Sequence, residues 1–193
     1  ASISYKHHND LFSVFYTGYS PSGYSFCYNG DINEDGFRSD LMYIPANDSE
    51  IKFTNDADRK VFWDFVNQDS YLKNHKGQYA EAYSARAPFV HRFDFKWAHD
   101  FKLNVGDTKH TLQLSLDIMN VGNLFNSKWG VEKNMLSCAN GQILKVDKVD
   151  NTGTPYFSMN TNSDKSAITH TWEFNHNYEQ CWKLQIGVKY YFN

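Results

Sequence analysis

The stretch WKLQIGVKYYFN, residues 182–193, decides the fold. Successive side chains of a β-strand point to opposite faces, so alternate residues share a face. One alternate set is apolar or aromatic: Trp182, Leu184, Ile186, Val188, Tyr190 and Phe192. The intervening set is mostly polar: Lys183, Gln185, Gly187, Lys189 and Tyr191. The pattern predicts an amphipathic strand.

Two earlier segments share this design. HRFDFKWAHDFKLNV, residues 91–105, has an apolar set: Phe93, Phe95, Trp97, Phe101, Leu103 and Val105. The set facing the other way is charged: Arg92, Asp94, Lys96, Asp100 and Lys102. HTLQLSLDIMNV, residues 110–121, again alternates leucines and an isoleucine with polar residues. An antiparallel sheet with one apolar face follows from the three segments together.

The length of these strands separates a membrane sheet from a soluble one. Soluble strands usually run about five or six residues, whereas a membrane-spanning strand needs about 9–11. The segments above are longer, and aromatic residues gather near their ends, as in barrels whose rings sit at the membrane interface. This favours an outer-membrane barrel over a soluble sandwich. His99 is the exception, because it falls on the apolar side; either the register breaks there, or that face contacts something other than lipid.

The connections between the strands are of two kinds. We predict five strands, over 1–8, 10–29, 89–104, 109–121 and 181–193, in an all-β fold. Short turns join the first to the second and the third to the fourth, and the other connections, 30–88 and 122–180, are long. Up-and-down strands place both short turns on one side and both long loops on the other. This asymmetry is typical of bacterial outer-membrane barrels, which have short periplasmic turns and long extracellular loops.

The long connections carry signals of their own. A helix is expected from about Asp56, packing over the barrel mouth, because apolar residues recur at helical spacing: Val61, Phe62, Phe65, Val66 and Leu72. The stretch 137–164 is rich in Asn, Asp, Gly, Ser and Thr, which predicts an exposed hairpin or an irregular loop. Within 10–29, Pro21 and Gly23 indicate a bulge or an unpaired stretch.

Composition narrows the classes of protein that fit. The chain has 193 residues, enough for one domain, with 41% hydrophobic and 17% aromatic residues. The net charge is -3 and both signs are interspersed, so there is no basic footprint for nucleic acid. No run approaches the roughly 18 apolar residues of a transmembrane helix, so any membrane contact is expected through β-structure. The chain opens inside a strand pattern without a signal peptide, and five strands cannot close a barrel, so we expect a segment of a longer protein.

The three cysteines are Cys27, Cys138 and Cys181. They show no CxxC spacing and no zinc pattern. Cys138 and Cys181 both fall in or near the second long loop, so a disulfide between them is one interpretation in an oxidising compartment. The other interpretation is that all three are free cysteines, small residues that lie buried or in loops.

The sequence DINEDG, residues 31–36, resembles the start of a calcium-binding loop. Oxygen-bearing side chains stand at positions one, three and five, and glycine at six: Asp31, Asn33, Asp35 and Gly36. Position twelve is Met42, where an EF-hand needs a glutamate, and Asp40 is the carboxylate that would replace it. A calcium ion is therefore the one cofactor the sequence suggests. The alternative is a turn braced by Asp and Asn side chains.

Signatures of catalysis are missing from the sequence. There is no HExxH, no GxSxG, no phosphate-binding loop and no ordered Ser-His-Asp set. The eight histidines are scattered. We therefore expect no enzyme, and the charged set from Arg92 to Lys102 is interpreted as lining a lumen or contacting a plug.

Four stretches together resemble the C-terminal end of TonB-dependent outer-membrane receptors, in particular the Oar-like group of Bacteroidetes related to SusC-type transporters. The stretches are 28–45 (YNGDINEDGFRSDLMYIP), 62–96, 116–130 (LDIMNVGNLFNSKWG) and 182–193. The resemblance implies the last five strands of a barrel of about 22 strands. It also implies a set of partners: the rest of the barrel and its plug, lipid and lipopolysaccharide, the barrel-assembly machinery, TonB through an N-terminal part, and a surface lipoprotein.

The resemblance gives the terminal strand a second role. The alternating residues Trp182 to Phe192 resemble the assembly signal that ends such barrels, with Phe192 as its aromatic residue. The predicted function is barrel wall, extracellular loops and assembly signal of a transporter, with the C-terminus in the periplasm. Two alternatives stay open: a soluble, calcium-dependent adhesion or glycan-binding sandwich, and a partial barrel held by an assembly or secretion complex.

Overall fold

The computed structural model describes residues 1–38, 40–135 and 141–192. The chain is mostly β-strand with few helices, as the sequence predicts. It divides into two compact units, which are described separately. The first consists of Ala1–Pro21, Pro88–Glu132 and Phe174–Asn193, and the second of Ser22–Ala87 and Lys133–Glu173.

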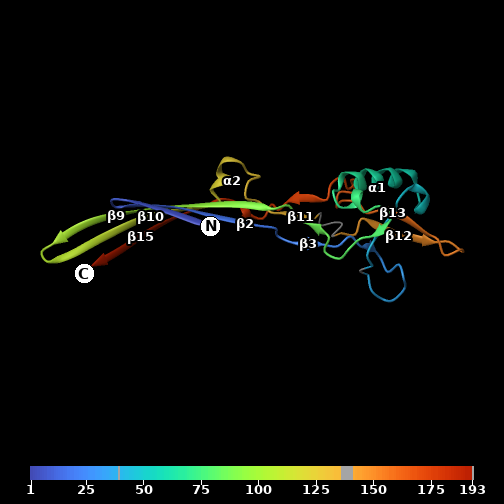
Figure 1. Cartoon of the computed structure of the whole chain (residues 1–193), viewed down its shortest axis with the longest axis horizontal. Coiled ribbons are helices and arrows are strands. Elements are labelled where there is room, and N and C mark those ends of the chain that lie inside the picture. The colour runs from blue at the N-terminus through green and yellow to red at the C-terminus, as the bar shows by residue number, and fades with distance from the viewer. Residues whose placement is uncertain (39, 136–140, 193) are drawn as a thin grey trace. The chain divides into compact units, whose positions relative to one another are not determined.

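The first unit is built on an antiparallel sheet of five strands among the described residues. Its order is β1-β2-β9-β10-β15, and the strands lie side by side in Figure 1. The strands are β1 (Ser2–His7), β2 (Asp10–Tyr19), β9 (Val90–Val105), β10 (Thr108–Met119) and β15 (Lys183–Phe192). Short helices α2 (Val121–Phe125) and η3 (Tyr178–Gln180) belong to the same unit. The described strands form an open sheet, with β1 and β15 at its edges.

The second strand ends earlier than the sequence analysis expected. It stops at Tyr19 rather than continuing to residue 29. Proline has no N–H to donate to a sheet, and Pro21 follows the last paired residue closely. The chain then enters the second unit, where Phe26 and Tyr28 become core residues with 0% and 6% exposure. The prediction of a single strand over 10–29 is therefore wrong.

The second unit is formed by the two long connections folding together. Its strands are β3 (Gly23–Tyr24), β4 (Tyr28–Asn29), β5 (Tyr43–Ile44), β6 (Lys52–Phe53), β7 (Gln78–Tyr79), β8 (Ala85–Arg86), β11 (Lys133–Met135), β12 (Leu144–Val149), β13 (Pro155–Met159) and β14 (Trp172–Phe174). Its helices are η1 (Asp48–Glu50), α1 (Asp56–Gln68) and η2 (Leu72–Asn74). The antiparallel hairpin β12–β13 is flanked by β4 and β6, each in parallel pairing.

Helix α1 begins where its sequence predicts. The Asn55 side chain accepts a hydrogen bond from the Asp58 amide at 2.8 Å, and acidic residues occupy the first turn, which suits the positive end of the helix dipole. Its apolar face packs into a hydrophobic core where Phe62, Phe65 and Val66 are fully or almost fully buried. Figure 1 shows α1 beside β13, a strand of the other long connection.

The prediction for the stretch 137–164 is right about a hairpin and wrong about its exposure. Its described residues, 141–164, contain the hairpin β12–β13, one of the two outcomes that the sequence predicts. The hairpin is less exposed than expected, because Leu144, Phe157 and Met159 are buried in the common core. Tyr28 stacks on Phe157 with ring centroids 5.4 Å apart. Polar composition concealed these few apolar positions, which pack only because the other loop supplies the opposite wall of the core.

Candidate functional site: the two faces of the five-stranded sheet

The register of the sheet places most of the large apolar side chains of the five strands on one face, whereas Leu11, Phe15 and Met119 lie on the other. Tyr5 pairs with Phe12, Phe12 with Trp97, Trp97 with Leu116, and Leu116 with Ile186. Pairs of this kind recur along the whole sheet, so the predicted alternation of residues 91–105, 110–121 and 182–193 is combined into one continuous surface. We call it the apolar face.

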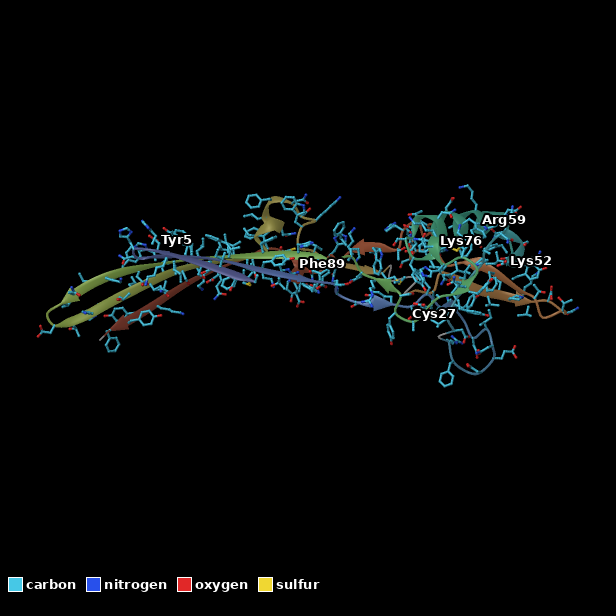
Figure 2. All side chains as sticks on the ribbon, in the orientation of Figure 1. Tyr5, Cys27, Lys52, Arg59, Lys76 and Phe89 are labelled. Carbon is cyan, nitrogen blue, oxygen red and sulfur yellow. The ribbon has the colours of Figure 1, made fainter. Side chains whose placement is uncertain are left out.

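The apolar face is open over much of its area. Ile186 is 65% exposed, Val188 66% and Ile3 72%, although an isolated alternating strand in a folded domain normally buries such residues. Tyr5, labelled in Figure 2, is likewise exposed. Contiguous exposed apolar surface on this scale marks a surface that contacts lipid or another macromolecule.

The terminal strand places most of the predicted assembly-signal residues on the apolar face. Leu184, Ile186, Val188, Tyr190 and Phe192 pair through β10 with Ile118, Leu116, Leu114, Leu112 and His110 in turn. Trp182 precedes the strand, because β15 begins at Lys183. The Trp182 amide instead donates to Asn123 Oδ1 at 3.1 Å.

His99 lies on the apolar face with its register unbroken. It stands between Asp10 on β2, where the pairing of β2 with β9 ends, and Leu114 on β10, and neither pairing shifts in register. His99 Nδ1 lies 2.7 Å from Asp10 Oδ1, and Trp97 Nε1 donates to the same oxygen at 2.8 Å. The register is therefore unbroken, and the polar contact of His99 on the apolar face is the Asp10 carboxylate.

The charged set predicted to face a lumen lies on the opposite, polar face, and all five residues have polar partners there. Lys96 Nζ donates to Asp117 at 2.7 Å, Gln113 donates to Asp100 at 2.8 Å, and Lys102 Nζ donates to Asn9 Oδ1 at 3.0 Å. Asp94 accepts from the Asn120 amide at 2.7 Å, and Arg92 donates to the Gly130 carbonyl and to Gln180 Oε1. The charges of these five residues are therefore all satisfied on the polar face.

A polar hub joins the ends of β9, β10 and β15, and the sequence analysis assigned it no role. Asn120, directly after β10, is 3% exposed, and its amide group donates to the carbonyls of Gly130 at 3.1 Å and Gln180 at 2.7 Å. Asn123 donates to the carbonyls of Ser127 and Trp129. These residues lie in MNVGNLFNSKWG, so the hub explains why asparagine and glycine recur in that stretch.

Backbone geometry fixes the residue types at two positions of the hub. Asn120 has φ +50°, a left-handed conformation that asparagine tolerates better than most residues. Gly130 has φ +64°, and a Cβ there would lie 2.0 Å from Asn120 Oδ1. Glycine is therefore required where the chain passes over the asparagine side chain.

Both ends of the apolar face carry a histidine paired with a tyrosine. Tyr16 OH lies 2.9 Å from His91 Nδ1 near the long loops. Near the β9–β10 turn, His110 Nδ1 is hydrogen-bonded to Tyr190 OH, and the two rings stack. Tyrosine and histidine combine a ring with polar atoms, which suits a boundary between hydrocarbon and water.

The Asp31 loop is braced by its own backbone. Asp31 accepts from the amides of Asp35 at 3.2 Å and Gly36 at 2.8 Å, and Asp40 accepts from the Ile32 amide at 2.9 Å. Asn33 accepts from the Asp35 amide at 3.1 Å. Within the described residues, no three His, Cys, Asp or Glu side chains gather as a metal site. These hydrogen bonds brace the turn, and calcium binding by Asp31, Asn33, Asp35 and Asp40 stays a prediction.

The described cysteines differ in their surroundings. Cys181 is exposed, whereas Cys27 is partly buried, and this burial, reinforced by the negative charge of Asp40, raises the pKa of the Cys27 thiol. Cys138 lies outside the described residues, so the Cys138–Cys181 disulfide stays a prediction.

Comparison with family models, with curated proteins and with solved structures found no match for this chain. In the parts of the chain that the structure describes, no helix has the length and apolar character needed to cross a membrane.

Proposed function

We propose that the chain forms part of the wall of a bacterial outer-membrane β-barrel, of the TonB-dependent, Oar-like and SusC-related receptor type that its sequence resembles. The observation that carries the proposal is the continuous apolar face, exposed across all five strands and backed by a face on which the five charged residues of β9 have polar partners. Lipid on one side and a polar lumen on the other would satisfy both faces at once.

Strand length and the polar ends support this orientation. His91 and Leu103, the partner of His110, are separated on β9 by about 40 Å at about 3.4 Å per residue. Strands in such barrels tilt by about 45°, which projects this span to about 28 Å along the membrane normal, near the hydrocarbon thickness of about 30 Å. The two His–Tyr pairs would then lie at the two interfaces.

The stagger of the turns also fits tilted strands. The β1–β2 turn ends opposite His99, and the Asp100 amide donates to the Asn9 carbonyl at 2.9 Å. Strand β9 continues beyond this point to Val105 before its own turn. Closing a sheet into a barrel requires tilt and stagger between neighbouring strands.

The remaining parts take their roles from this orientation. The second unit would lie outside the cell and contribute to substrate capture, and the short turns and the C-terminus would face the periplasm. The edges β1 and β15 would pair with other strands of the same barrel, because unpaired backbone groups are very costly in lipid. Strand β15 would also serve as the signal for the assembly machinery.

A gel of the outer-membrane fraction, probed for this chain with and without boiling, tests the proposal. A folded barrel that resists detergent gives a band whose mobility changes on heating. A band near 22.5 kDa in the soluble fraction, unchanged by heating, would contradict the proposal and favour a soluble binding module. A band seen only in complex with assembly or secretion proteins would favour the partial barrel.

A further inference from the structure

Asp10 is the one acidic residue on the apolar face among the described strands. It lies at the start of β2, opposite His7 on β1 and His99 on β9. The other carboxylates of the sheet, at Asp94, Asp100 and Asp117, have the opposite parity and lie on the polar face. A carboxylate at this position needs a specific explanation, because an ionised group facing a membrane is expensive unless it is paired.

The neighbours of Asp10 donate hydrogen bonds but supply no permanent charge. A carboxylate only accepts, so His99 carries its proton on Nδ1, and both this group and the Trp97 indole N–H donate to Asp10 Oδ1. Neither bond neutralises the carboxylate while the imidazole is uncharged. Lys6 and Lys102 alternate to the polar face and do not compensate it.

His7 adds a second polar group beside Asp10 and His99. We call the group of His7, Asp10, Trp97 and His99 the corner. His7 is the cross-strand partner of Asp10, and such partners have Cβ atoms about 4.5–5.5 Å apart. The His8 ring packs edge-on against His7 with centroids 4.2 Å apart. The Asp10 and His99 side chains are 28% and 25% exposed, so the corner is accessible from outside. It therefore offers an acceptor for a cation beside imidazole donors for an anion.

We propose that this corner, formed by His7, Asp10, Trp97 and His99, binds the headgroup of a phospholipid that carries a primary ammonium. The ammonium donates to Asp10, and the imidazole of His7 donates to the phosphate. Two carbons join these charges in an ethanolamine headgroup, which suits an acid and an imidazole on neighbouring strands. The acyl chains would lie over Phe12 and Leu114, which flank the corner on the apolar face.

This inference rests on the proposed function, because it requires the apolar face to lie in lipid. The competing explanation is internal: a protonated His99 would neutralise Asp10 and leave no need for an external cation. The test separates the two by comparing headgroups with identical acyl chains. Phosphatidylethanolamine offers N–H donors, whereas the trimethylammonium group of phosphatidylcholine offers none.

The experiment uses the full-length protein, purified in a non-ionic detergent, with dioleoyl lipids added in equal amounts. Native mass spectrometry measures the lipid retained. We expect phosphatidylethanolamine to be retained about tenfold over phosphatidylcholine, as one charge-assisted hydrogen bond allows. Asp10→Asn should reduce this preference to about one. Asp100→Asn, which changes the adjacent carboxylate on the polar face, should leave it intact.

A second variant keeps the proposal testable if Asp10→Asn does not fold. His7→Phe leaves Asp10 in place but removes the phosphate donor, so it should lower the retention of both lipids while the preference for phosphatidylethanolamine persists. Equal retention of the two lipids by the wild type, or a preference that survives Asp10→Asn, overturns the proposal, and stronger retention of phosphatidylglycerol does the same. Heat-modifiable mobility is recorded for every variant, so a barrel that forms without headgroup preference is distinguished from a chain that forms no barrel.

Discussion

Lys96 and Asp117 stand directly opposite each other on β9 and β10, and Lys96 Nζ donates to Asp117 Oδ1 at 2.7 Å. Their immediate neighbours along the strands, Trp97 and Leu116, are likewise paired but point to the other face. The same two strands thus carry an ion pair on one side and an apolar contact on the other. This division between the faces is the physical basis of the proposed barrel wall.

A positive charge should destabilise the fold much more on the apolar face than on the polar face. Leu116→Lys places an ammonium in the middle of the apolar face, which costs about 2–4 kcal/mol near the centre of a bilayer. Gln185→Lys, on the polar face of the neighbouring strand β15, puts a cation directly opposite Asp117 and should cost little. Folding into lipid vesicles, followed by heat-modifiable mobility, measures both. Equal effects of the two changes would argue against a lipid-facing surface.

The hub at the end of β10 should be sensitive to small changes. Asn120→Ala removes the bonds to the Gly130 and Gln180 carbonyls and places alanine at φ +50°, so we expect a loss of about 2–4 kcal/mol in the free energy of unfolding. Denaturant titration measures this loss. Asn126→Ala, at an exposed position beyond α2, is the control and should change stability by less than about 1 kcal/mol. A loss of that small size at Asn120 would show that the hub is dispensable.

The two described cysteines should react with thiol reagents at different rates. Burial raises the pKa of Cys27, so at pH 8 a smaller fraction is thiolate than for an unperturbed thiol, and alkylation should be slow. Cys181 is exposed and should react faster, unless it is bonded to Cys138. Peptide mapping after iodoacetamide treatment, with and without prior reduction, measures both rates. Faster alkylation of Cys27 than of reduced Cys181 would contradict the burial described above.

The Asp31 loop should keep its conformation without calcium. The side-chain oxygens of Asp31, Asn33 and Asp35 already accept backbone hydrogen bonds, so no cation is needed to order the turn. Calorimetric titration with calcium should give no heat that Asp31→Asn removes. Binding that disappears in Asp31→Asn but persists in Asp164→Asn, a change in another exposed turn, would establish the calcium interpretation instead.

The sequence predicts the five-stranded sheet more completely than it predicts the second unit. Alternation from Phe93 to Val105 and from Leu184 to Phe192 predicts strands and faces, because period-two patterning is a local property. The common core of Phe26, Phe62 and Phe157 could not be predicted in this way, because it joins residues from two connections far apart in the chain. Nor could the pairing of Asp10 with His99, which depends on the register between β2 and β9.

Contact between the apolar face and lipid is the central claim, and β15 offers its most direct test. Single cysteines in a background with the three native cysteines replaced by serine would carry a fluorophore at Leu184, Ile186, Val188, Gln185 or Lys189. Brominated lipids quench only fluorophores within the bilayer. We expect strong quenching at Leu184, Ile186 and Val188 and weak quenching at Gln185 and Lys189. Uniformly weak quenching, or quenching without this alternation, would contradict the claim.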